Sequence, residues 1–150
     1  MSKNLKVAIV NYEVGNTCSV KNAFERFDNC EVVLTDDLAI ISSADAIVLP
    51  GVGAYRDATR ALQEKKLLST LENVAFSQKK PFLAICLGMQ LLFESSEEGG
   101  HYQGLGWIPG KVVRFDVPGL HVPHFPLRTR QLQKHLKWKM ELKVWQKTPS

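Results

Sequence analysis

"PFLAICLGMQLLF", residues 81–93, joins an apolar, strand-like run to a helix-like run through a cysteine. No loop separates the two patterns, so the chain must turn from strand to helix at Cys86. A residue on such a sharp turn has its side chain forced outward at the end of the sheet, and the small neighbours Ala84 and Gly88 permit the tight crossing. We therefore expect an exposed thiol at a strand–helix elbow, where the helix dipole favours the reactive thiolate.

Strand-like and helix-like patterns alternate along the rest of the chain. Four short apolar runs are typical of buried strands, at residues 5–12, 30–35, 44–50 and 81–85. Helical patterns follow or separate them at residues 15–27, 56–62, 67–78 and 87–93. This alternation predicts the α/β class with a doubly wound, mostly parallel sheet.

In such a sheet the active crevice lies beyond the carboxyl ends of the strands. "PGVGAY" follows the third predicted strand, and a purely structural interpretation of it is a tight turn. Gly51 and Gly53, which flank Val52, also let the backbone take positive φ and approach a ligand closely. The amides of this segment, with the N–H of Leu87, would then form an oxyanion hole beside Cys86.

The length and composition limit the class of protein to which this chain can belong. A chain of 150 residues with 45% hydrophobic content suits one domain with one core. The first residues have too short an apolar run for a signal peptide, and no stretch is long enough to span a membrane, so we expect a cytoplasmic protein without membrane attachment. Three widely spaced cysteines fit neither a disulfide framework nor a zinc site, and we expect Cys18 and Cys30 to be buried small hydrophobes.

Charge is unevenly distributed along the chain. Residues 1–125 hold 12 Lys and Arg against 14 Asp and Glu, whereas residues 126–150 hold 7 against 1, a segment charge of +6. The basic segment lacks Gly-rich or aromatic-rich recognition motifs, and most charge runs are simply solvated. We therefore expect no nucleic-acid partner.

Four motifs recur in order along the chain: "LPGVGAY", "PFLAICLGMQLLFESSEEG", "GLGWIPGKVVRF" and "VPH". Between Lys6 and His124 the sequence resembles the class I glutamine amidotransferases, and among them the glutaminase subunits of imidazole glycerol phosphate synthase. The resemblance implies a flavodoxin-like domain, without a metal or other cofactor, that hydrolyses glutamine to glutamate and ammonia through a cysteine thioester.

The same resemblance implies the roles of single residues and the partner. Cys86 is the nucleophile, Gly51, Val52 and Gly53 form the oxyanion strand, and Gln90 helps to hold glutamine. The implied partner is a (β/α)-barrel cyclase subunit, which forms a heterodimer with the glutaminase and uses its ammonia in histidine biosynthesis.

Three departures from the family pattern stand out. The first loop reads Asn-Tyr-Glu-Val-Gly-Asn at residues 11–16, where Asp-Tyr-Gly-x-Gly-Asn is usual, and Ala84 replaces the usual glycine. After "VPH" the family continues with Met-Gly-Trp-Asn and later His-Pro-Glu, which supplies the other two triad residues. Here a basic segment follows, so we divide the chain into a partial amidotransferase domain at 1–124, incomplete at its C-terminal end, and a non-matching tail at 125–150. A change of reading frame near Phe125 is our leading explanation.

The histidines offer no obvious base for Cys86. None of His101, His121, His124 and His135 is followed by Pro-Glu, and we expect each to be structural or solvated. Impaired glutaminase activity is therefore expected for this chain.

Three alternatives stay open: a glutaminase serving a sugar amidotransferase, a non-catalytic domain that binds a partner, and another elbow-cysteine enzyme or thiol sensor. Gln90 and the "PGVG" segment argue against the last of these.

Overall fold

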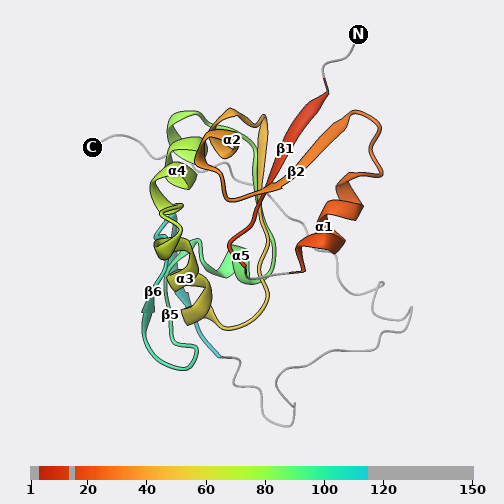
Figure 1. Ribbon diagram of the computed structural model, residues 1–150. Coiled ribbons are helices and arrows are strands. Elements are labelled where there is room, and N and C mark those ends of the chain that lie inside the picture. The colour runs from red at the N-terminus through yellow and green to blue at the C-terminus, as the bar shows by residue number, and fades with distance from the viewer. Residues whose placement is uncertain (1–3, 14–15, 115–150) are drawn as a thin grey trace, which may run out of the picture. The chain divides into compact units, whose positions relative to one another are not determined.

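Four parallel strands form the first sheet of the computed structural model, which describes residues 4–13 and 16–114 (Figure 1). They are β1 (Leu5–Val10), β2 (Cys30–Thr35), β3 (Ala46–Leu49) and β4 (Phe82–Ala84). Their order is β2-β1-β3-β4, and every pairing is parallel. The prediction of a parallel α/β sheet is confirmed, and the order agrees with the flavodoxin-like arrangement, in which strand 1 lies between strands 2 and 3.

Helices connect these strands and cover them unequally. They are α1 (Thr17–Phe24), α2 (Leu38–Ser43), α3 (Tyr55–Glu64), α4 (Leu68–Glu72), the π-helical turn η1 (Asn73–Ser77) and α5 (Leu87–Gln90). Figure 1 shows α1 on one side of the sheet and α2, α3 and α4 on the other.

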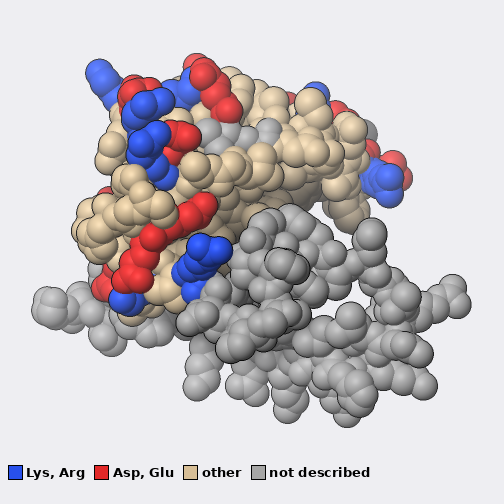
Figure 2. Space-filling view, turned by 90° about the horizontal axis from the view of Figure 1, so that it is seen from below, with Lys and Arg blue, Asp and Glu red and all other residues tan. Residues whose placement is uncertain are grey.

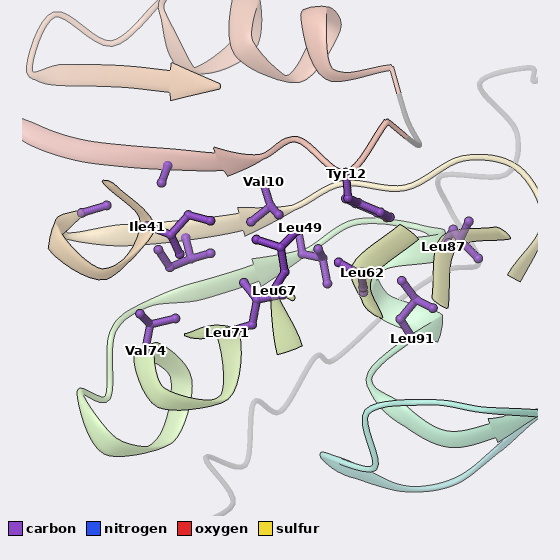
Figure 3. Close-up of a cluster of buried hydrophobic side chains, with 14 of the residues drawn as sticks. Val10, Tyr12, Ile41, Leu49, Leu62, Leu67, Leu71, Val74, Leu87 and Leu91 are labelled. Carbon is purple, nitrogen blue, oxygen red and sulfur yellow. The ribbon is translucent and has the colours of Figure 1, made fainter. Parts of the chain in front are cut away.

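The core divides along the two faces of the sheet. Alternate residues of β1 serve different faces, since Ala8 and Val10 belong to the larger cluster and Val7 and Ile9 to the smaller one. The larger cluster contains the side chains drawn in Figure 3, including Val10, Tyr12, Ile41, Leu49, Leu62, Leu67, Leu71, Val74, Leu87 and Leu91. The first turn of α5, directly after Cys86, is thereby anchored in the main core.

A second, three-stranded sheet follows α5. It consists of β5 (Phe93–Ser96), β6 (Tyr102–Gln103) and β7 (Ile108–Val112), in the order β6-β5-β7. The Trp107 ring packs edge-on against Phe76 of η1 and Phe82 of β4, with centroid distances of 5.1 Å in both pairs. These aromatic contacts connect the start of β7 with the end of the first sheet.

The helical predictions were only partly right. The pattern at 87–93 predicts one helix, but α5 ends at Gln90 and β5 begins at Phe93, where it pairs with β7. The pattern at 67–78 is helical from Leu68 to Ser77, as a short α-helix that continues into a π-helical turn. The helix predicted at 15–27 ends at Phe24, and Phe27, which lies beyond that end, is 59% exposed.

One helix has no counterpart among the predictions. Helix α2 begins after Asp37, whose carboxylate accepts hydrogen bonds from the Ala39 and Ile40 amides at 2.8 and 3.1 Å. Ile41 on this helix is fully buried.

None of the helices within residues 4–13 and 16–114 is both long and apolar enough to cross a bilayer. The basic segment 125–150 lies outside the described residues, as do His121, His124 and His135.

Candidate active site

Cys86 lies at the junction between β4 and α5, as the local sequence predicts. The strand ends at Ala84, the helix begins at Leu87, and Cys86 is exposed. Its backbone has φ 53° and ψ −114°, a conformation that L-residues rarely adopt. Strain of this kind, about 1–3 kcal/mol, persists only where the surrounding structure imposes it, and it is concentrated at functional sites.

Two glycines allow this elbow to touch the end of β3. A Cβ atom at Gly88 would lie 2.1 Å from the Leu49 carbonyl oxygen, and one at Gly51 would lie 2.6 Å from the Gly88 nitrogen. Both distances are far below a van der Waals contact, so only glycine fits at either position. The segment after β3 and the first turn of α5 therefore meet backbone to backbone, which brings the predicted oxyanion segment against the cysteine elbow.

The segment Gly51–Gly53 has the mixed geometry expected of a ligand-facing loop. Gly51 is buried, whereas Val52 is 52% exposed and Gly53 is exposed with φ 107°. The positive φ predicted for this segment is found at Gly53, while Gly51 is required for space. Chemically, the segment offers backbone N–H groups and no charged side chain, and Gly51 lies against the first turn of α5.

Leu87 and Gln90 flank the cysteine on α5. Leu87 carries its side chain into the core at 3% exposure, and its N–H belongs to the first turn, where helix amides have no intrahelical acceptor. Gln90 is half-buried, and its N–H donates to the Cys86 carbonyl oxygen at 3.1 Å. Residues four apart lie on the same side of a helix, so Gln90 is placed next to Cys86.

Tyr12 belongs to this region but is not among the predicted site residues. It lies two residues after the end of β1, is fully buried, and its hydroxyl donates a hydrogen bond to the Pro50 carbonyl oxygen. Burial raises the pKa of Tyr12 well above the usual value of a phenol. Figure 3 shows Tyr12 in the same half of the core cluster as Leu87 and Leu91. The sequence places Tyr12 in the loop after the first strand, but only the pairing of β1 with β3 shows that this loop meets Pro50.

The first loop is held by a cluster of charged groups. Lys65, at the end of α3, donates to Asp36 at 2.8 Å and forms an ion pair with Glu13 at 3.0 Å. These bonds lower the pKa of Asp36 and raise that of Lys65. Glu13 has φ 66°, which explains why glycine is usual at this position of the family pattern.

No base for the thiol can be assigned within the described residues. His101 is exposed in the loop before β6, and the carboxylate in its vicinity, Glu97, is bonded to Lys111 at 2.5 Å. Lys111, and to a smaller extent His101, lowers the pKa of Glu97. Within residues 4–13 and 16–114 no group of three or more His, Cys, Asp or Glu residues gathers as a metal site.

The remaining cysteines differ from the prediction. Cys18 is exposed rather than buried, because it lies two residues from Val20 on α1 and so points away from the face that packs on the sheet. Cys30 is half-buried against the smaller core.

Figure 2 shows acidic and basic side chains side by side on one face of the described chain, with wide uncharged areas between the groups.

Comparisons with known proteins find similarity over most of the chain. The chain is 44% identical over 132 residues to "Imidazole glycerol phosphate synthase subunit HisH 2" of Vibrio vulnificus, which covers 87% of this chain and 61% of that protein. It is 48% identical over 122 residues to the HisH subunit of Sulfurimonas denitrificans, with 79% and 58% covered, and 42% identical over 120 residues to that of Aquifex aeolicus, with 80% and 57% covered.

The chain thus spans about three fifths of the length of the curated relatives that it matches. The sequence model of the family "Glutamine amidotransferase class-I" matches residues 8–148, which is most of the chain. This protein therefore belongs to the class I glutamine amidotransferase family.

Proposed function

We propose that this chain contributes the nucleophile half of a glutaminase site, in a subunit of the imidazole glycerol phosphate synthase type. The observation that carries the proposal is the strained, exposed Cys86 on an elbow packed backbone to backbone against Gly51. The names of the relatives favour this synthase over a sugar amidotransferase as the acceptor.

In the proposed reaction, the Cys86 sulfur attacks the carbonyl carbon of the glutamine side-chain amide. The negative charge that develops on the carbonyl oxygen is stabilised by backbone N–H groups of Gly51–Gly53 and of Leu87. The C–N bond breaks, the nitrogen takes up a proton and leaves as ammonia, and the glutamyl thioester remains on Cys86. Water then hydrolyses the thioester to glutamate and restores the thiol. Gln90, on the same side of α5, helps to hold the substrate.

We further propose that the ammonia passes to a (β/α)-barrel cyclase subunit in a heterodimer for histidine biosynthesis. The cytoplasm is the proposed compartment, because the reaction needs a reduced Cys86 and the thiols of all three cysteines are free. Residues 1–124, which carry the four motifs quoted above, are proposed as the amidotransferase part of the chain.

Labelling with a glutamine-shaped chloromethyl ketone, 6-chloro-5-oxo-norleucine, tests the proposal. Cys18 is an internal control because it is also exposed. We expect the ketone to alkylate Cys86 in preference to Cys18, glutamine to protect Cys86, and iodoacetamide, which lacks the glutamine frame, to show a much smaller preference. Equal labelling of both cysteines by the ketone, without protection by glutamine, would refute the assignment.

A non-catalytic, partner-binding role is the second candidate. It is favoured by one observation, that the 150 residues contain no His-Pro-Glu segment to supply a base and its carboxylate. Loss of the base from such a unit costs on the order of 10⁴-fold or more in rate, although oxyanion and binding contributions remain. We therefore propose that glutamate release by this chain is low, with or without a cyclase partner. Turnover equal to that of a full-length relative, abolished by Cys86→Ala, would contradict this.

A further inference from the structure

We propose that Tyr12 is a positioning residue for the oxyanion segment, because its hydroxyl fixes the peptide that joins Pro50 to Gly51. The inference rests on the proposed function and extends it to a residue outside the family motifs around Cys86. Tyr12 has no exposed surface, and its hydroxyl donates to the Pro50 carbonyl oxygen across 38 positions of sequence. The hydrogen bond thus connects the ends of two neighbouring strands, β1 and β3.

Peptide planarity transmits the effect of this hydrogen bond. The Pro50 carbonyl and the Gly51 N–H belong to one planar trans peptide and point in opposite directions. Holding the carbonyl on the Tyr12 hydroxyl therefore holds the Gly51 N–H on the other side. The proline ring already fixes its own φ, so little rotational freedom remains before Gly51.

Gly51 is also enclosed sterically. A Cβ atom there would lie 2.8 Å from the Tyr12 hydroxyl oxygen and 2.6 Å from the nitrogen of Gly88. Gly51 therefore sits between the Tyr12 hydroxyl and the first turn of α5, which starts one residue after Cys86. The hydroxyl thus sets both the orientation of the first oxyanion amide and its distance from the nucleophile.

The chemistry of Tyr12 suits a fixed donor rather than an acid or base. Burial keeps its pKa well above the usual value, so the phenol stays protonated over the whole range of physiological pH. Tyr55 provides a natural contrast within the same core: it is equally buried, yet its hydroxyl has no hydrogen-bond partner among the described residues. If only the aromatic ring mattered, phenylalanine would serve equally well at both positions.

The test compares Tyr12→Phe and Tyr55→Phe in the full 150-residue chain, using two reagents at Cys86. The glutamine-shaped chloromethyl ketone places a carbonyl where an oxyanion forms, whereas iodoacetamide alkylates the thiol directly and reports its accessibility and reactivity alone. The measured quantity is the ratio of the two rate constants. We expect Tyr12→Phe to lower this ratio about tenfold or more, since removing one oxyanion donor costs about 10²–10³-fold and a misdirected donor costs less. Tyr55→Phe is expected to change it less than about twofold, because its hydroxyl makes no hydrogen bond to the part of the chain that the structure describes.

Three results would overturn the inference. An unchanged ratio in Tyr12→Phe would mean that the hydroxyl does not direct the amide, and an equal slowing by both reagents would mean that it only supports the fold. A wild-type chain whose ketone labelling does not favour Cys86 over Cys18 would instead refute the proposed function, and the inference with it. Circular dichroism reports whether each variant folds, and a variant that does not fold in buffer is measured in sodium sulfate, which strengthens apolar burial.

Discussion

Gly88→Ala should break the contact on which the site is built. The new Cβ would lie 2.1 Å from the Leu49 carbonyl oxygen, where ordinary contact begins at 3.4 Å, so the two backbones would have to separate by about 1.3 Å. Separation is resisted because the same oxygen accepts a hydrogen bond from the Ile85 amide at 3.0 Å. Overpacking costs about 1–3 kcal/mol, and weakening a buried hydrogen bond adds about 1 kcal/mol. We therefore expect a loss of about 3 kcal/mol in the free energy of unfolding.

Urea unfolding followed by circular dichroism measures this loss, and Gly99→Ala is the matched control. Gly99 has φ +66° and nothing within 4 Å of an added Cβ, so alanine there costs only the left-handed conformation, about 1 kcal/mol. If Gly88→Ala destabilises the chain no more than Gly99→Ala does, the close backbone contact does not exist as described. In the folded fraction of Gly88→Ala, labelling of Cys86 by the ketone should also be slowed more than labelling by iodoacetamide.

Three further outcomes are expected. Asp37→Ala removes the side chain that caps α2 and should cost about 1 kcal/mol in urea unfolding, with Ser at this position restoring most of the loss. Trp107→Leu removes edge-on contacts with two phenylalanine rings and should cost about 2 kcal/mol by the same measurement. Lys65 lowers the pKa of Asp36, so their interaction is fully present above the usual Asp36 pKa of 3.8 and is lost as the pH falls through the lower folded value. The stability difference between wild type and Lys65→Met should accordingly shrink below about pH 4, and a difference that stays constant down to pH 2 would exclude this pair as its source.

The parallel sheet was predictable because each of its strands is a short apolar run that needs no distant partner to be recognised. The apolar period of residues 87–93 was misleading for the opposite reason. Its last residue, Phe93, begins β5, which pairs with residues 102–103 and 108–112, and no local pattern reveals pairing over such a separation. Helix α2 was missed because its six residues are too few to show a helical period, although Asp37 is a recognisable cap.

The candidate site likewise has one part that the sequence predicted and another part that only the structure revealed. The Cys86 elbow could be predicted from the sequence, because the strand, the cysteine and the small neighbours follow one another in the chain. Tyr12 needed the structure, because its role depends on β1 lying beside β3, which brings its hydroxyl to Pro50. Cys18 was assigned to the core from residue type alone, although its position relative to Val20 and Phe24 already placed it opposite the packed face.

The proposed chemistry has two halves: the nucleophile with its oxyanion amides, and the acid–base group that moves protons. The elbow, the glycine segment and the Tyr12 hydrogen bond are built from backbone packing within residues 4–13 and 16–114, and none of these features needs a histidine. In the proposed mechanism, attack on an activated carbonyl depends mainly on this half, because it uses only the proposed oxyanion amides and the exposed thiol. Turnover of glutamine depends on both halves, since the departing ammonia needs a proton from a positioned acid. Ketone labelling therefore reports whether the nucleophile half is formed, and glutamate release reports whether a base completes it.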